Sequence, residues 1–159
     1  MKITHSVFGE LTFDNGWTKY IDLYIFRKSY SVEVNIDADE DGEFDENQIQ
    51  AFEFFFQDIQ NRIAQAESAI VSYYDSIIDK VLEQVTDRAI ESKFAVAKGN
   101  PDEIFELLTV KQLLFPMNFD EETREAGFIC DCEWDIENGV GIKYINELIS
   151  EIGYQDILL

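Results

Sequence analysis

Residues 17–36, WTKYIDLYIFRKSYSVEVNI, are the most informative stretch for predicting the fold. In its first half Ile21, Leu23 and Ile25 alternate with Tyr20, Asp22 and Tyr24, and the second half continues the alternation from Tyr30 to Ile36. Successive side chains of a strand point to opposite faces, so each half has one apolar and one polar face. The stretch therefore predicts two antiparallel strands of a sheet that is covered on a single side.

A strand is predicted before residues 17–36 and a helix after them. Phe8–Phe13 precedes Asp14-Asn15-Gly16, and Asn-Gly is a strong hairpin signal because both residues tolerate positive φ. Asp45-Glu46-Asn47-Gln48 is typical of a helix start, with a capping residue and Gln three positions later. Two apolar stripes at helical spacing follow, formed by Ile49, Phe52, Phe56, Ile59 and Ile63 and by Ile70, Tyr74, Ile77, Val81 and Val85.

These two stripes predict two packed helices rather than one. No Gly or Pro lies between Gly42 and Gly99, and a single helix over that length would measure about 75 Å. A domain of this size has a radius of gyration of only about 15 Å, so we predict a break near Ala64–Ser68. Asn100-Pro101 begins a third, short helix that ends near Leu108, because Asn suits the N-cap and Pro the first helical position.

The remaining third of the chain predicts strands again. They are Val110–Phe115, Phe128–Asp135, Val140–Tyr144 after an Asn138-Gly139 turn, and Leu148–Ile152. The predicted fold is a single α+β domain over residues 1–159. Its antiparallel sheet combines N-terminal and C-terminal strands in the order β-β-β-α-α-α-β-β-β-β, with the helices packed on one face.

The charge of the chain excludes some classes of partner. The 33 acidic and 12 basic residues give a net charge of −21, whereas 46% hydrophobic residues are too many for a disordered chain. Residues 37–66 contribute −8 and residues 101–159 contribute −11, while residues 1–36 are neutral. Such a field repels nucleic acid and anionic membranes and attracts cations and basic proteins.

Compartment signals are few. Residues 1–13 lack the apolar core of a signal peptide, and no apolar run reaches the length of a membrane span, so we expect a cytoplasmic protein. Cys130 and Cys132 would point the same way on one strand, which disfavours a disulfide between them. They are predicted to be small buried hydrophobic residues; a metal pair is the alternative, although His5 is the only histidine.

Residues 37–48 have the spacing of a calcium-binding EF-hand loop. Asp37, Asp39, Asp41 and Asp45 occupy ligand positions, and Gly42 occupies the sharp turn. The last position is Gln48 rather than a bidentate Glu, and a strand rather than a helix precedes the loop. Calcium binding by Asp37, Asp39, Asp41 and Asp45 is one interpretation. An acidic turn in which Gln48 caps the helix is the other.

A second acidic cluster lies on the predicted strand Phe128–Asp135. Asp131, Glu133 and Asp135 would share its outward face, about 7 Å apart. Such a row could bind a divalent cation, supply the acid and base of a hydrolase, or contact a basic protein. The remaining interpretation is a strand face exposed to solvent. The sequence has no Gly-x-Ser-x-Gly elbow and no phosphate-binding loop, so we expect no enzyme. Phe54, which points away from the first stripe, either packs internally or anchors a partner or a homodimer.

The end of the chain resembles a family of small acidic bacterial domains without an assigned activity. The similarity rests on Cys132-Glu133-Trp134-Asp135, on Glu137-Asn138-Gly139-Val140-Gly141 and on Gly153-Tyr154-Gln155-Asp156-Ile157. Phe8-Gly9-Glu10-Leu11 and the helix start at Gln48 are also similar. The resemblance implies this fold, a bacterial cytoplasm and an accessory or immunity-type role in a toxin system. It implies no catalytic residues.

Together these observations predict a non-enzymatic protein-binding module, an immunity-like acidic antagonist of a basic toxin. The charges expected to steer and contact the partner are Asp37, Asp39, Glu40, Asp41, Asp131, Glu133 and Asp135. A calcium-binding domain is the alternative, and a carboxylate hydrolase is a third. We expect no nucleic acid, no membrane and no cofactor other than calcium, and a homodimer stays open.

Overall fold

A computed structural model describes residues 1–159 as eight strands and four helices, followed by a short 3-10 turn. The strands form one sheet in sequence order, β1 to β8. All neighbours are antiparallel except β4 and β5, which are parallel because the four helices connect them. The strands are β1 (Lys2–His5), β2 (Gly9–Phe13), β3 (Trp17–Ile25), β4 (Lys28–Ile36), β5 (Leu108–Phe115), β6 (Glu125–Cys132), β7 (Val140–Ile145) and β8 (Leu148–Gly153).

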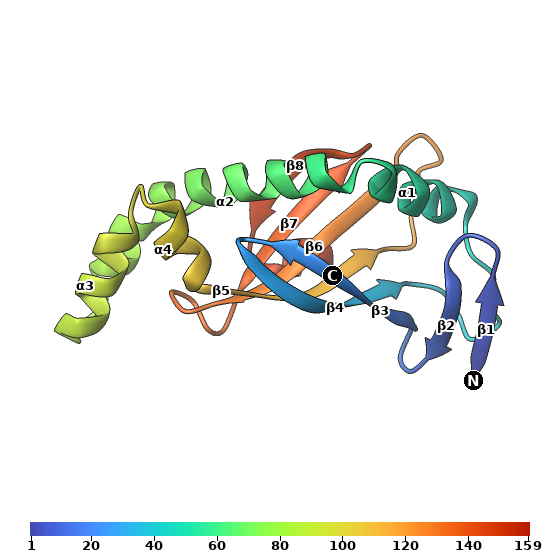
Figure 1. Cartoon of the computed structure of the whole chain (residues 1–159), viewed down its shortest axis with the longest axis horizontal. Helices are drawn as coiled ribbons and strands as arrows, with labels where there is room; N and C mark the ends of the chain where they lie inside the picture. Colours follow the sequence, from blue (N-terminus) through green and yellow to red (C-terminus); the bar gives the residue numbers. More distant parts are fainter.

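The helices lie between the two halves of the sheet in sequence and cover one of its faces (Figure 1). They are α1 (Glu46–Gln57), α2 (Ile59–Leu82), α3 (Arg88–Ala97) and α4 (Pro101–Glu106). Helix α2 runs along the sheet and continues beyond it, where α3 and α4 pack at its far end (Figure 1). None of these helices combines the length and the apolar character that crossing a membrane requires.

The predicted one-sided burial is confirmed for β3 and β4. In β4, Val32, Val34 and Ile36 are fully buried, whereas the residues between them are only partly buried or exposed. An aromatic cluster joins helix and sheet: the Phe55 ring of α1 lies 5.8 Å from Phe115 and 5.1 Å from Tyr144, measured between ring centroids. The apolar face of the sheet therefore forms the core together with α1 and α2.

The prediction of a helix break near Ala64–Ser68 is wrong. Those residues lie inside α2, where Ala66 is fully buried. The chain breaks instead at Asp58, whose φ of −138° and ψ of 58° are not helical, and again after Leu82. The prediction assumed a nearly spherical domain. The molecule is elongated, so a helix of 24 residues, about 36 Å long, fits along it (Figure 1).

Strand β1 is a further difference, since only three strands were predicted before the helices. It pairs with β2 from Lys2 to His5. His5 ends the strand in an ordered turn, because its Nδ1 accepts hydrogen bonds from the backbone N–H groups of Val7 (3.0 Å) and Phe8 (3.3 Å). Helix α3 was not predicted either, so four helices stand where three were expected. The general order of strands, then helices, then strands is as predicted.

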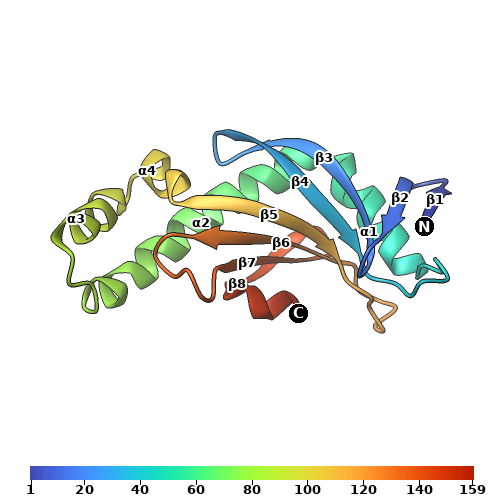
Figure 2. The ribbon, with the colours of Figure 1, turned by 90° about the horizontal axis from the view of Figure 1, so that it is seen from below.

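The second face of the sheet, here called the outer face, is partly covered by the 3-10 turn η1 (Gln155–Leu158) (Figure 2). Four glycines of β6, β7, β8 and the β6–β7 connection lie under this turn: Gly127, Gly139, Gly141 and Gly153. A Cβ at Gly127 would meet the Leu158 side chain, and one at Gly139 would meet Gln155. The turn thus lies close to the sheet because these positions have no side chain.

Candidate functional site

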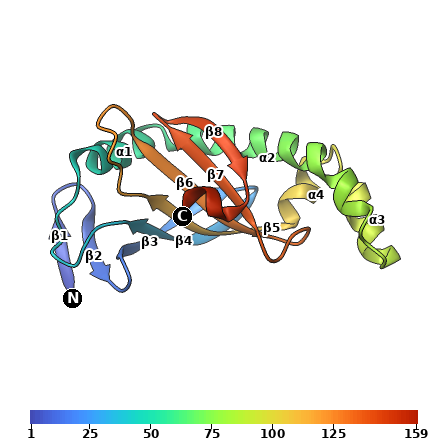
Figure 3. The same cartoon turned by 180° about the vertical axis from the view of Figure 1, so that it is seen from behind.

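Two acidic loops meet at one end of the molecule, beside the start of α1. One loop connects β4 to α1, and the other connects β5 to β6 (Figures 1 and 3). The side-chain amide of Asn47 donates a 2.7 Å hydrogen bond to the backbone oxygen of Asp120, which links them. We call this surface the acidic end; it comprises Asp37, Asp39, Glu40, Asp41, Glu43, Asp45, Glu46, Asp120, Glu121 and Glu122, together with Phe119.

The carboxylates of the acidic end are exposed and lack internal counter-charges. All ten side chains are exposed, and none takes part in the seven ion pairs of the structure. Phe119 stands among them with 88% of its surface exposed. The loops leave between them a cleft of about 440 Å³, lined in part by Asn118, Phe119 and Glu121. The surface therefore combines uncompensated negative charge with an accessible aromatic ring.

Hydrogen bonds hold both loops in place. The indole Nε1 of Trp17 donates to the backbone oxygen of Asp39 at 2.9 Å, which fixes the first loop to the sheet. In the second loop the Asn118 amide donates to the Thr123 backbone oxygen at 2.6 Å, and its oxygen accepts from the Asp120 N–H at 2.9 Å. The acidic end is thus ordered before any partner arrives, which lowers the entropy cost of binding.

The EF-hand-like spacing does not bring its predicted ligands together. No group of three or more His, Cys, Asp or Glu side chains in the chain is arranged to hold a metal ion. Gln48, at the last position of the pattern, is 2% exposed, and its amide donates to the backbone oxygens of Asp37 (2.6 Å) and Phe115 (3.2 Å). Its Oε1 accepts from the Asp45 N–H at 3.0 Å. This is the predicted capping role; calcium binding by Asp37, Asp39, Asp41 and Asp45 stays a prediction.

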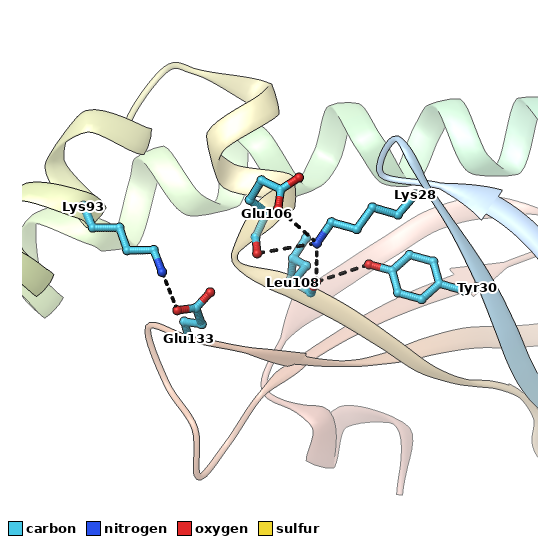
Figure 4. Close-up of polar contacts among 6 residues, drawn as sticks. All are labelled: Lys28, Tyr30, Lys93, Glu106, Leu108 and Glu133. Carbon is cyan, nitrogen blue, oxygen red and sulfur yellow. Dashed lines mark hydrogen bonds and ion pairs between the residues drawn. The ribbon is translucent and has the colours of Figure 1, made fainter.

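The predicted row of Asp131, Glu133 and Asp135 is not a row, because β6 ends at Cys132. Only Asp131 lies on the strand, and its carboxylate is 3.7 Å from Lys111 Nζ. Glu133 forms a 2.7 Å ion pair with Lys93 of α3 (Figure 4). Asp135 accepts hydrogen bonds from Asn138 inside the turn. The geometry on which a cation or hydrolase site here depended is therefore absent.

The two groups of predicted partner-binding residues lie near opposite ends of β6. Asp37, Asp39, Glu40 and Asp41 belong to the acidic end, next to the start of β6, whereas Asp131 and Glu133 lie at its finish. A strand of this length spans about 23 Å. Glu133 is also part of the contacts that join α3 and α4 to the sheet, together with Lys28, which lies 3.8 Å from Glu106 (Figure 4).

Asp120, Glu121, Glu122 and Phe119 were not predicted as site residues, although the sequence shows them as an acidic run. The signal was available in the net charge of −11 over residues 101–159. What the sequence did not show is that this run lies beside the loop that follows β4, because the contact joins residues 47 and 120.

Neither cysteine is a candidate nucleophile. Both are free and buried, as predicted, and burial raises the pKa of Cys130 well above its ordinary value and that of Cys132 to about 12. The reactive thiolate is therefore disfavoured at both positions. Phe54 is partly exposed rather than packed in the core, and the Arg124 guanidinium lies 4.8 Å from its ring centroid. Arg124 in turn pairs with Glu147 at 2.8 Å.

The outer face contains the second hollow of interest, a pocket of about 530 Å³ that we call the outer-face pocket. It lies between the ends of β4 and β5 and the turn η1, where Ile157 and Leu158 form one wall. Its polar residues are Asn35, Asp37, Gln112, Glu125 and Lys143, and its apolar ones include Leu114 and Met117. Asp37 belongs to both surfaces, so the pocket and the acidic end adjoin.

Comparison with known proteins agrees with the resemblance found in the sequence. Searches of curated proteins and of solved structures found no match. A family model described as "Domain of unknown function (DUF6985)" matches residues 7–159, which is nearly the whole chain. The matched range includes every strand after β1, all four helices and η1. The chain therefore belongs to the DUF6985 family of domains of unknown function.

Proposed function

We propose that the chain is a protein-binding module whose acidic end binds a basic protein, as an immunity-like antagonist of a basic toxin would. The observation that carries the proposal is that two neighbouring loops and the start of α1 carry ten exposed carboxylates without ion pairs, with the exposed ring of Phe119 on one of the loops. Such charges steer a basic partner and select it, while an exposed aromatic side chain beside them supplies contact area.

The structure favours the acidic end over the other predicted charges. Asp131 and Glu133 already face lysines of the chain itself, so a partner would have to compete with those lysines. The acidic end has no such internal competitor. The side chains of Trp17, Asn47 and Asn118 donate hydrogen bonds to backbone oxygens of its loops, so little ordering is needed on binding.

The test uses a fluorescently labelled peptide rich in arginine and glycine as the probe, with binding followed by fluorescence anisotropy. The acidic-end variant D120N/E121Q/E122Q is compared with a variant of equal charge at the other end of β6, D131N/E133Q/E137Q. We expect the first to lose roughly 10-fold in affinity and the second less than about 3-fold. Binding of the native chain should weaken strongly between about 50 and 500 mM NaCl.

Two results would contradict the proposal. Equal losses in the two variants would mean that the peptide senses only the net charge of −21. Binding that does not respond to salt would show that electrostatic attraction contributes nothing.

The variant Phe119→Ala separates the aromatic contribution, since it should weaken binding without changing the salt dependence. The toxin-specific part of the proposal predicts a gene for a basic toxin beside this one, and inhibition of its product by the native chain. Absence of such a gene, or failure to inhibit its product, would reject that part.

A further inference from the structure

The outer-face pocket follows one row of neighbouring residues across four strands. In the register of the sheet, Asn35 of β4 lies beside Leu114, Leu114 beside Gly127, and Gly127 beside Lys143 of β7. Gly127 has no side chain, so the row has a gap at its centre. Leu158 of η1 reaches that gap, because a Cβ at position 127 would lie 2.7 Å from its Cδ1. Leu158 of η1 thus occupies the space above Gly127, and together with Ile157 it forms one wall of the pocket.

The pocket opens at the base of the acidic end. Asp37, which lines it, is the first residue of the loop after β4. Pro116 and Met117, which also line it, begin the loop after β5. Both loops of the acidic end therefore start at the rim of the pocket. A protein segment bound across these loops would have this hollow directly beside it.

The lining combines apolar side chains with hydrogen-bond acceptors. Leu114, Met117 and Leu158 supply the apolar part. The carboxylates of Asp37 and Glu125 form no ion pair in the structure. Gln112 donates its Nε2 to Glu33 at 2.9 Å, which leaves its Oε1 as an acceptor.

We propose that the outer-face pocket receives an arginine side chain of the basic partner, a proposal that rests on the proposed function. Arginine has an apolar stem and a planar head with five N–H donors, so it matches a lining that offers both apolar side chains and several acceptors. Lysine offers fewer donors and a more strongly hydrated charge. An arginine buried near the centre of an interface is also a frequent hot spot of binding energy.

Lys143 is the one basic residue in the lining. It lies directly opposite Glu151 of β8 in the sheet, and opposite charges at such positions attract each other. With Asp37 and Glu125 facing the same hollow, the lining remains negative overall. Replacing Lys143 by Gln should therefore strengthen arginine binding, by roughly 2- to 5-fold.

The test measures the pocket separately from the acidic loops, by methyl NMR of Leu114, Met117 and Leu158 in the full chain. The probe is N-acetyl-L-arginine methylamide. Its citrulline analogue has nearly the same shape without the charge, and its glutamate analogue reverses the charge. We expect saturable shifts of these three methyl groups with the arginine probe and at least roughly 5-fold weaker binding of the citrulline analogue.

Matched variants assign the response to the pocket. D37N/E125Q should weaken binding of the arginine probe by roughly 5-fold or more, whereas D120N/E121Q/E122Q should change it less than about 2-fold. Met117→Trp tests the walls by filling the hollow, and Met117→Leu keeps its volume. A fold check by amide NMR accompanies each variant. Equal binding of the arginine and citrulline probes would overturn the proposal. So would binding of the glutamate probe at Lys143 that is tighter than binding of the arginine probe.

The two proposals fail in different ways. If the arginine-rich peptide binds the acidic end and the three pocket methyl groups do not shift, the proposed function stands and the arginine pocket is rejected. If the small arginine probe shifts these methyl groups and the peptide is indifferent to D120N/E121Q/E122Q, the pocket stands and the acidic end is not the binding surface.

Discussion

Replacing Gly139 by alanine should destabilise the fold by considerably more than a methyl group on the surface normally does. Gly139 ends the connection between β6 and β7 with a φ of 59°, in the left-handed region. A Cβ at this position would lie 2.7 Å from the backbone oxygen of Cys130 and within the space of the Gln155 side-chain amide. That amide donates a 2.7 Å hydrogen bond to the same oxygen of Cys130. The substitution therefore changes both the backbone and the contact that holds η1.

The two contributions can be given magnitudes. An alanine held at positive φ costs about 1 kcal/mol. Displacing the Gln155 amide leaves the Cys130 oxygen without that donor, which costs a further ~1–3 kcal/mol. We expect Gly139→Ala to lower the free energy of unfolding by about 2–4 kcal/mol in total. Gly99 provides the matched control, since its φ is 72° and a Cβ there would meet nothing within 4 Å. Gly99→Ala should cost about 1 kcal/mol, the backbone contribution alone.

Urea unfolding followed by circular dichroism measures these differences, provided that the slopes of the transitions agree. The variant Gln155→Ala completes a double-mutant cycle, because it removes the side chain that the new methyl group would displace. Adding Gly139→Ala to it should cost less than in the native chain. The reasoning is refuted if Gly139→Ala costs no more than Gly99→Ala, or if the cost is the same with and without Gln155.

Three further predictions concern the core, the helix start and the pH dependence. Phe55→Ala should lower the free energy of unfolding by about 3–5 kcal/mol in urea, because Phe55 is 1% exposed and central to the aromatic cluster; a loss below ~1 kcal/mol would contradict that packing. Gln48→Glu would restore the usual last ligand of an EF-hand loop, yet it should destabilise by about 2–3 kcal/mol with or without calcium, because the buried amide loses its two donated hydrogen bonds; recovery in calcium would instead favour the calcium interpretation. Burial raises the pKa of Tyr30 and of Cys132 to about 12, so both stay protonated in the fold while the unfolded chain releases their protons; stability measured against pH should hold up to about pH 9 and fall above it, and a constant value to pH 11 would contradict this.

The alternation in residues 17–36 was sufficient to predict the sheet and the face that is covered. Side-chain direction in a strand depends only on position along the chain, so Val32, Val34 and Ile36 had to share a face. The same local logic predicted the capping role of Gln48 and the burial of both cysteines. The sequence motifs of the family could be recognised as well, but not the structural reason for their glycines. The structure shows that Gly139 and Gly141 leave room for Gln155 and Ile157 of the ending.

Helix length and strand ends were less predictable, because they depend on what the element packs against. Asp58 is not a helix breaker by type, and Ala66 gives no sign that α2 continues through it on the sheet. Similarly, the alternation through Asp135 suggested a strand, whereas pairing with β7 stops at Cys130 and the chain turns after Cys132. Because Glu133 and Asp135 lie beyond the end of β6, they do not form the predicted row of carboxylates with Asp131.

Local sequence patterns were enough to predict the general order of strands, helices and strands, the one-sided burial of β3 and β4, and the two acidic regions, since each of these is a property of neighbouring residues. Which acidic residues lie beside one another depends instead on the tertiary structure. The parallel pairing of β4 with β5 brings the ends of both strands to the same edge, so the loops that follow them meet there. The register from Asn35 to Lys143 then forms the pocket beside them. Both arrangements depend on contacts between residues about 70 positions or more apart, which no local pattern encodes.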